Sequence, residues 1–182
     1  MKKLRVFESI SVDGYFTDAR GDMGWAHASP EDPEFAAWVG ENASGGGELL
    51  FGRKTYRMME AFWPTPQAAE QMPAVAKGMN AAKKYVASRT ITPAWNNTHL
   101  LHGDLLEAVR ALKRTDGPGI TVLGSGDVAA QLGAAGLVDE YQLVVIPVAL
   151  GGGRTIFAEG RSLRLSNQRA FACGNVVLTY AT

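Results

Sequence analysis

Cysteine, net charge and long hydrophobic runs are all scarce in this chain of 182 residues, and each scarcity excludes a class of protein. The single cysteine, Cys173, excludes an internal disulfide and any zinc or iron–sulfur site built from several cysteines of one chain. The formal net charge of zero gives no overall attraction to DNA, RNA or an anionic membrane. No run approaches membrane-spanning length, and Glu8 and Asp13 interrupt the short apolar run near the N-terminus, so we expect no signal peptide. We therefore expect a cytoplasmic protein that binds neither nucleic acid nor a membrane.

The remaining composition is that of an ordinary globular protein, with 46% hydrophobic and 20% charged residues. A chain of this length fits one domain, so we expect a single domain over residues 1–182. Metal binding is not indicated, because His27, His99 and His102 lack the helical spacing to acidic residues that a metal site shows.

Segments rich in β-formers alternate with segments of helical periodicity. The expected strands are Leu4–Ile10, Glu48–Phe51, Lys84–Ser88, His99–Leu101, Ile120–Leu123, Tyr141–Val148, Leu165–Ala172 and Asn175–Tyr180. The expected helices run from a cap at Ser29 to Gly40, from Gly52 to Ala61, from a cap at Asp104 to Gly117, and from Asp127 to Ala135. The part between Trp63 and Ala82 is weakly patterned, which predicts a covering loop or a loose helix. This order predicts an α/β fold with a mixed sheet that ends in an antiparallel hairpin.

Two of these strands break on glycine directly before a helix. One junction is VLGSGDVAAQL (122–132) and the other is ELLFGRKT (48–55). The first turn of a helix has unpaired backbone N–H groups and a positive field, so each junction is suited to an anion such as a phosphate. The first junction lacks the full G-x-G-x-x-G pattern, and each junction alone is also explained as a tight turn.

Cationic and hydroxyl side chains stand close to these turns. Arg53 and Lys54 at a helix start oppose the helix dipole unless an anion sits there. Ser88 and Arg89, after the next strand, have the chemistry that suits a ribose 2′-phosphate, although a solvated surface arginine is the other interpretation.

The segments SVDGYFTD, GWA, FGRKT, VASR, VLGSGDVAAQL and GLVDEYQLVVIPVALGGGRTIF, in that order, resemble the reductase domain of riboflavin biosynthesis and its single-domain relatives. That family shares the dihydrofolate reductase fold, so the resemblance implies a three-layer α/β structure with helices on both faces of a mostly parallel sheet. It also implies NADPH as cofactor, a heterocyclic small-molecule substrate and a homodimer. The zinc deaminase motif that often accompanies the reductase domain is absent.

The resemblance implies a role for each matching residue. The cofactor-binding residues would be Gly52, Arg53, Lys54 and Thr55, then Ser88 and Arg89, then Gly124, Ser125, Gly126 and Asp127. The substrate-binding residues would be Ser11, Gly14, Pro147, Gly152 and Arg154, and the catalytic group would comprise Asp13, Trp25 and Asp32.

Several of these roles have a structural alternative. A carboxylate at Asp127 repels phosphate unless it caps its own helix, and we expect that it does. Asp32 and Glu34 lie near the position of the proton-donating acid of dihydrofolate reductases, but both also suit the role of a first-turn partner of the helix dipole. Trp25 suits stacking on a flat heterocycle or packing into the core, and Arg154 suits an anionic substrate group or a surface salt bridge.

We expect an NADPH-dependent reductase that transfers a hydride to a pteridine-like or ribosylaminopyrimidine-like compound, with the proton coming from Asp13 or water. A nucleotide-binding or ligand-sensing module without turnover, and a purely structural protein, are the alternatives on the same fold. The apolar run 143–150 and the terminal hairpin predict an apolar sheet edge that a second subunit covers.

Overall fold

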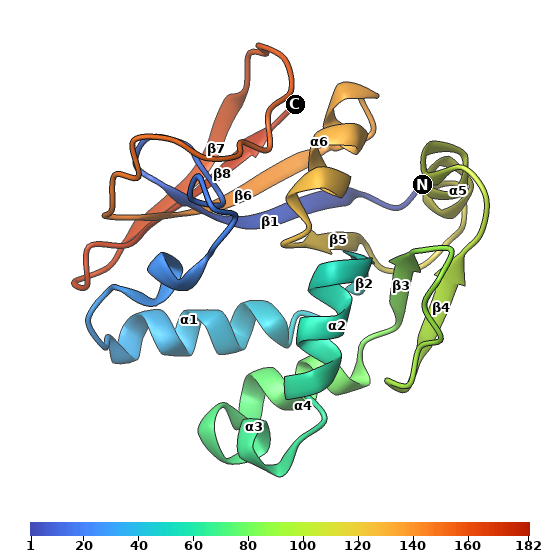
Figure 1. The fold of residues 1–182 in the computed structure, drawn as a ribbon, viewed down its shortest axis with the longest axis horizontal. Helices are drawn as coiled ribbons and strands as arrows, with labels where there is room; N and C mark the ends of the chain where they lie inside the picture. Colours follow the sequence, from blue (N-terminus) through green and yellow to red (C-terminus); the bar gives the residue numbers. More distant parts are fainter.

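The structure is built around eight strands. They are β1 (Leu4–Ser11), β2 (Glu48–Gly52), β3 (Lys84–Ala87), β4 (Thr98–Leu101), β5 (Ile120–Leu123), β6 (Glu140–Ile146), β7 (Arg164–Ala170) and β8 (Val176–Ala181). In the computed structural model, which describes residues 1–182, they form one sheet in the order β4-β3-β2-β5-β1-β6-β8-β7 (Figure 1). Strands β1 to β6 pair in parallel, and β8 joins β6 and β7 antiparallel. The expected mixed α/β fold with a terminal hairpin is confirmed.

Helices cover both faces of the sheet (Figure 1). They are the 3-10 helix η1 (Gly24–His27) and the α-helices α1 (Pro33–Ala43), α2 (Arg53–Phe62), α3 (Pro66–Gln71), α4 (Pro73–Ala81), α5 (Leu105–Lys113) and α6 (Gly126–Ala134). Residues of α5 and α6 pack with one face of β1, β5 and β6 in the largest core cluster. Residues of α1, α2 and α4 fill two smaller clusters that contain the other side chains of the strands. The layers follow from the alternation of side chains along each strand.

The start of α1 differs from the expectation. Asp32, not Ser29, caps this helix, because its Oδ1 accepts hydrogen bonds from the backbone N–H groups of Glu34 and Phe35. Ser29 instead donates its hydroxyl proton to Asn175 Oδ1 at 2.5 Å. Proline directly after Asp32 favours the later start, since proline fits the first helical position.

The weakly patterned part after Trp63 forms two helices, α3 and α4, so of the two expected alternatives the loop is wrong and the helix is the closer one. Pro66 and Pro73 occupy the starts of these helices, and Thr65 caps α3. Lys84, fully buried, donates from Nζ to the carbonyls of Met79 and Ala82 at 2.8 and 2.6 Å. A cation at a helix C-terminus satisfies carbonyls that have no partner within the helix.

The expected apolar sheet edge is also wrong. Strand β6 lies inside the sheet between β1 and β8, and the edge is β7, whose sequence RLSNQRA is polar and whose residues are all exposed. The pairing of β7 with β8 shifts between Leu165 and Asn167, which interrupts the regular ladder. Polar side chains and an irregular ladder both protect an edge strand from pairing with other chains.

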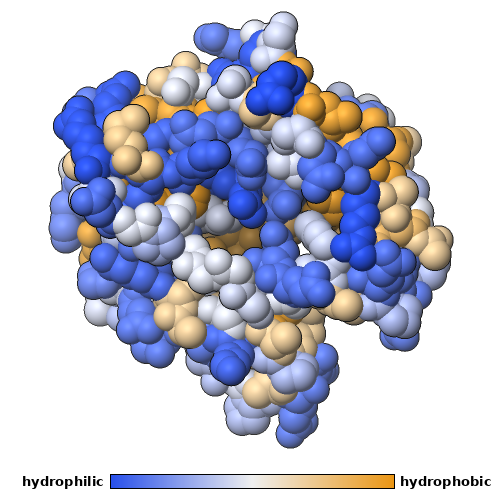
Figure 2. Space-filling view, turned by 180° about the vertical axis from the view of Figure 1, so that it is seen from behind, coloured by the Kyte–Doolittle hydropathy of each residue, from blue (hydrophilic) through white to orange (hydrophobic).

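The back of the molecule is mostly hydrophilic, and hydrophobic residues gather at its upper right, the side on which β7 and β8 lie (Figure 2). This agrees with the half-buried side chains of Val176, Leu178 and Tyr180 on β8 and with the exposed side chain of Leu165. No helix combines the length and hydrophobicity that crossing a membrane requires.

Candidate functional site

The predicted site residues gather at the edge of the sheet where the parallel strands end. Strand β1 ends at Ser11, β2 at Gly52, β3 just before Ser88, and β5 just before Gly124. Open α/β sheets bind ligands at this edge because the loops and helix N-termini that follow the strands meet there. The fold therefore brings together segments that are far apart in the sequence.

The two glycine junctions are in direct contact. The backbone N–H of Gly52 donates to Ser125 Oγ at 2.9 Å. A Cβ atom added at Gly124 would meet Thr55 Cγ2 at 3.3 Å, so the backbone of one turn passes close to the helix that follows the other. The contact follows from the pairing of β2 with β5, since the two strands deliver their glycines to neighbouring positions.

Neither helix that starts here has a side-chain cap. Gly52 precedes α2 and has no side chain to accept the first N–H groups, and Ser125 precedes α6 without capping it. Ser125 has φ 61° and ψ 48°, a left-handed conformation that disfavours residues other than glycine. Two helix N-termini with free N–H groups in contact with each other fit an anionic ligand, because their dipole fields add at that point.

Asp127 does not cap α6, so that expectation is wrong. Its carboxylate lies in the first turn of the helix and forms an ion pair with the guanidinium of Arg154. The surface salt bridge, one of the two interpretations of Arg154, is therefore the one the structure shows.

The predicted phosphate-binding cations are exposed and unpaired. No ion pair of the structure involves Arg53, Lys54 or Arg89. Ser88 and Arg89 line a cavity of about 240 Å³, together with Ala87, Leu101, Gly103, Leu105, Val128 and Gln131. The cavity lies between the ends of β3 and β4 and the first turns of α6, so it adjoins the glycine junctions. Its mixed lining of apolar and polar side chains fits a base or ribose better than a phosphate alone.

The turn after β1 and the loop after β6 form one unit. The Asp13 carboxylate accepts hydrogen bonds from the backbone N–H groups of Leu150 and Gly151, the latter at 2.7 Å. The backbone of Gly153 lies against the carbonyl of Thr17 so closely that a side chain at 153 would collide with it. Gly14 turns the chain at φ +86°. A Cβ atom added at Gly174, at the tip of the terminal hairpin, would meet Pro147 Cγ at 3.1 Å, whereas one added at Gly152 would meet nothing within 4 Å.

Both predicted acids are held by hydrogen bonds. Ser11 donates its hydroxyl proton to Asp13 at 2.5 Å, and this bond, followed by that from Gly151, lowers the pKa of Asp13 below its ordinary value. The backbone N–H groups of Cys173 and Phe35 likewise lower the pKa of Asp32. A carboxyl group with a lowered pKa is ionised at neutral pH and is a poor proton donor.

Trp25 lies in η1 and packs beside the cluster of Val144, Ile146, Phe171 and Val177. The ring is half-buried, and its Nε1 is inaccessible and has no hydrogen-bond partner. Packing against the core is thus part of its role, and any contact with a bound molecule would involve the accessible part of the ring and not the buried N–H.

Two residues of this region are missing from the sequence prediction. Glu8 on β1 is only 2% exposed, its Oε2 has no partner, and burial raises its pKa to about 8. The ring of Phe16 lies directly against Gly126, where a Cβ atom would collide with it. An acidic residue within a run of β-formers is a visible signal for Glu8, whereas nothing local in the sequence indicates the contact of Phe16.

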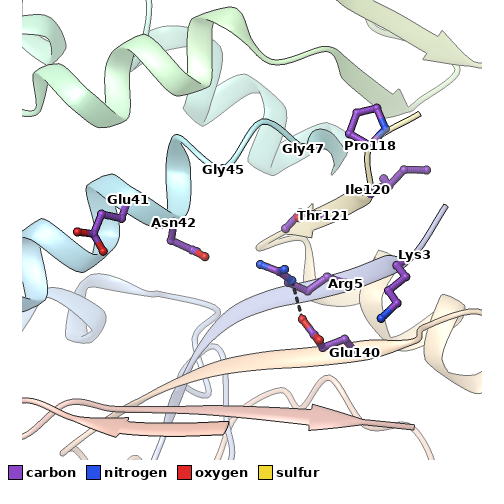
Figure 3. Close-up of a pocket in the computed structure, with 11 residues that line it drawn as sticks. Lys3, Arg5, Glu41, Asn42, Gly45, Gly47, Pro118, Ile120, Thr121 and Glu140 are labelled. Carbon is purple, nitrogen blue, oxygen red and sulfur yellow. Dashed lines mark ion pairs between the residues drawn. The ribbon is translucent and has the colours of Figure 1, made fainter. Parts of the chain in front are cut away.

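Another cavity, of about 430 Å³, lies at the opposite edge of the sheet (Figure 3). It is bordered by the end of α1 and the starts of β1 and β5, and Arg5 on its floor pairs with Glu140 at 2.8 Å. None of the predicted site residues lines it.

Comparison with known proteins places this geometry in context. Residues 2–179 match the family model of the RibD C-terminal domain. The uncharacterized protein YyaP of Bacillus subtilis (strain 168) is 28% identical over 185 residues, which cover 99% of this chain and 96% of YyaP.

Two solved structures are similar over nearly the whole chain. A "putative riboflavin biosynthesis protein" from Shewanella sp. PV-4 is 25% identical with a TM-score of 0.69, and 98% of each chain is covered. A pyrimidine reductase-like protein from Corynebacterium diphtheriae is 14% identical with a TM-score of 0.61, covering 99% of this chain and 91% of the other, and this likeness concerns the fold alone.

Proposed function

The chain belongs to the family of RibD C-terminal domains, and on that basis we propose that it is an NADPH-dependent reductase of a small heterocyclic compound. The reductase class rests on the family. The choice of cofactor and substrate rests on the arrangement of side chains at the carboxyl edge of the sheet.

One observation carries the cofactor proposal: the uncapped N-termini of α2 and α6 touch through Gly52 and Ser125. A pyrophosphate is long enough, and carries enough charge, to accept hydrogen bonds from the backbone N–H groups of both helices. The unpaired cations of Arg53 and Lys54 supply further charge, and the Thr55 hydroxyl is a further donor.

Preference for the phosphorylated dinucleotide is proposed from the neighbouring cavity. Ser88 and Arg89 are among its lining residues, and Leu101, Leu105 and Val128 provide apolar contacts. An adenosine in this cavity would bring its 2′-phosphate to the guanidinium of Arg89, which suits phosphate through paired N–H donors.

When bound, the nicotinamide supplies the hydride that reduces an electron-poor C=N or C=O carbon. Asp13 holds the turn after β1 to the loop after β6 through the N–H groups of Leu150 and Gly151, so it fixes the walls of the substrate site. Its lowered pKa makes water the proton donor in this proposal. Trp25, whose ring is half-buried, would border the substrate with the accessible part of that ring.

The substrate class is proposed from the same elements. A flat heterocycle of the pteridine or ribosylaminopyrimidine type offers a ring face for the half-buried Trp25 and polar edges for the backbone of the glycine segment 151–153.

The first test is a titration of the cofactor-free protein with NADPH and, separately, with NADH, followed by tryptophan quenching. We expect tighter binding of NADPH. Changing Arg53 and Arg89 together to methionine should weaken the binding of NADPH more than the binding of NADH. The matched control is Arg114→Met, at an exposed arginine outside this edge of the sheet. Equal losses for both cofactors would contradict the assignment of the 2′-phosphate.

One observation favours a second function, a binding module without turnover. Asp13 and Asp32 are both engaged as hydrogen-bond acceptors, which leaves neither as a free acid at the site. Such a module would bind NADPH and fail to oxidise it with any pterin or pyrimidine, so a spectrophotometric assay with a panel of these compounds separates the two functions.

We also propose that the protein is a homodimer. All residues of β7 are exposed, so neither face of this strand is covered in a single subunit, and the half-buried apolar residues of β8 lie beside it. A second subunit would cover one of these faces and would not pair with the edge of β7. Light scattering should give twice the mass of the 19.5 kDa chain, and a mass of 19.5 kDa at all concentrations would exclude the dimer.

A further inference from the structure

A carboxylate stands at the place where the proposed function puts a phosphate. Asp127 is the second residue of α6, and its side chain is 67% exposed at the uncapped start of that helix. An unpaired negative charge there would repel an anionic ligand and offset the favourable field of the helix N-terminus.

Arg154 neutralises this charge in the structure. Its guanidinium pairs with the Asp127 carboxylate and also lies over the ring of Phe16, with Cζ 5.3 Å from the ring centroid. The same ring packs against the backbone of Gly126, the first residue of α6. Two contacts therefore hold the Arg154 guanidinium at the start of α6: the ion pair with Asp127 and the cation–π contact with the ring of Phe16.

The backbone around Arg154 is fixed as well. Its carbonyl accepts the N–H of Phe16 at 2.8 Å, and its own N–H donates to Thr17 at 3.3 Å. The neighbouring Gly153 lies tightly against Thr17. The backbone of Arg154 is thus bonded, as in a β-bridge, to the segment that follows β1. This restricts the positions from which its side chain extends to α6.

We infer that Arg154 is a positioning residue for the cofactor: it cancels the charge of Asp127 and holds that carboxylate aside, so that the start of α6 accepts a phosphate. This inference rests on the proposed function. In it the arginine acts through Asp127 and is not itself a phosphate ligand.

A double-mutant cycle tests the inference on the full chain, with NADPH as the probe. Arg154→Met should weaken NADPH binding about tenfold, because it leaves Asp127 unpaired at the anion site. Asp127→Asn should bind at least as well as the wild type. The double variant should return to within about threefold of the wild type, because it removes the negative charge of Asp127, which repels the phosphate, together with the positive charge of Arg154.

A second measurement is salt dependence. The loss in Arg154→Met should shrink at high ionic strength, because exposed charges are screened. The exposed pair of Arg110 and Glu107 on α5 is the matched control, and Arg110→Met with Glu107→Gln should leave NADPH binding unchanged.

Three outcomes overturn the inference. A double variant as weak as Arg154→Met would make the arginine a direct ligand, and an Arg154→Met variant that binds like the wild type would leave the pair without a role. A wild type that binds no NADPH removes the proposed function and this inference with it. Should Arg154→Met fail to fold, as judged by thermal melting, Arg154→Gln in the Asp127→Asn background replaces it, and a further loss of affinity relative to Asp127→Asn alone overturns the inference.

Discussion

The backbone N–H of Gly52 and the hydroxyl oxygen of Ser125 are joined by a hydrogen bond of 2.9 Å, although 73 positions separate the two residues in the chain. The bond connects the end of β2 to the start of α6. Ser125 accepts it while in the left-handed conformation, so the side chain contributes to the site and the backbone is strained at the same residue.

Replacing Ser125 separates these two effects. Ser125→Ala loses the acceptor and keeps the strain, so we expect it to lower the free energy of unfolding by about 1 kcal/mol. Ser125→Gly loses the same acceptor but relieves about 1 kcal/mol of strain, so it should be the more stable variant. Urea unfolding measures both, and an alanine variant as stable as the glycine variant would show that the left-handed conformation costs nothing here.

Adding a methyl group at Gly126 should be costly. A Cβ atom there collides with the ring of Phe16, and overpacking of this kind destabilises proteins by about 1–3 kcal/mol. Gly126→Ala should therefore unfold at lower urea concentration. Phe16→Leu in the same chain should recover part of the loss, and the absence of any recovery would place the cause in the helix start and not in the ring.

Glu8 predicts a specific dependence of stability on pH. Burial raises its pKa from 4.5 to about 8, so the folded chain binds this proton more tightly than the unfolded chain does. The wild type should lose stability relative to Glu8→Gln as the pH rises from about 5 to about 8, by a few kcal/mol, because over this range the carboxyl ionises freely in the unfolded chain but stays protonated in the folded core. Urea unfolding of both proteins across this range is the measurement, and parallel curves would contradict the burial of an uncharged Glu8.

The adjacent lysines 83 and 84 provide a matched pair. Lys84 is fully buried, donates to carbonyls at the end of α4, and lies 4.4 Å from the centroid of the Trp95 ring. Lys84→Met should cost about 2–4 kcal/mol, since it leaves buried carbonyls without a donor. Lys83 is exposed, so Lys83→Met should change the free energy of unfolding by less than about 0.5 kcal/mol. Similar losses for both variants would show that the buried ammonium has no special role.

The sequence predicts the fold class and most elements of this protein because hydrophobic periodicity and glycine positions are local signals. Strand β5 and the start of α6 lie within a residue or two of the expected bounds. The two glycine junctions are visible separately, but their contact depends on β5 lying between β2 and β1, and a strand order is set by long-range packing.

The errors have physical causes of the same kind. Ser29 and Asp32 both fit a helix cap locally, and Pro33 together with the N–H of Cys173 decides in favour of Asp32. Asp127 was expected to cap α6, but its carboxylate pairs instead with Arg154, 27 residues further along the chain. The apolar run in β6 indicates burial on both faces, and the sequence does not say which strand covers its outer side.

The contact between Asp13 and Gly151 also has a consequence for the order of folding. It closes a loop of 138 residues, and long loops are entropically slow to close, so this contact should form after the local helices and neighbouring strand pairs. The turn after β1 therefore acquires its final shape only when the last third of the chain has folded. A nascent chain that has not yet released the segment around Gly151 would therefore hold β1 without the contact that fixes the turn after it.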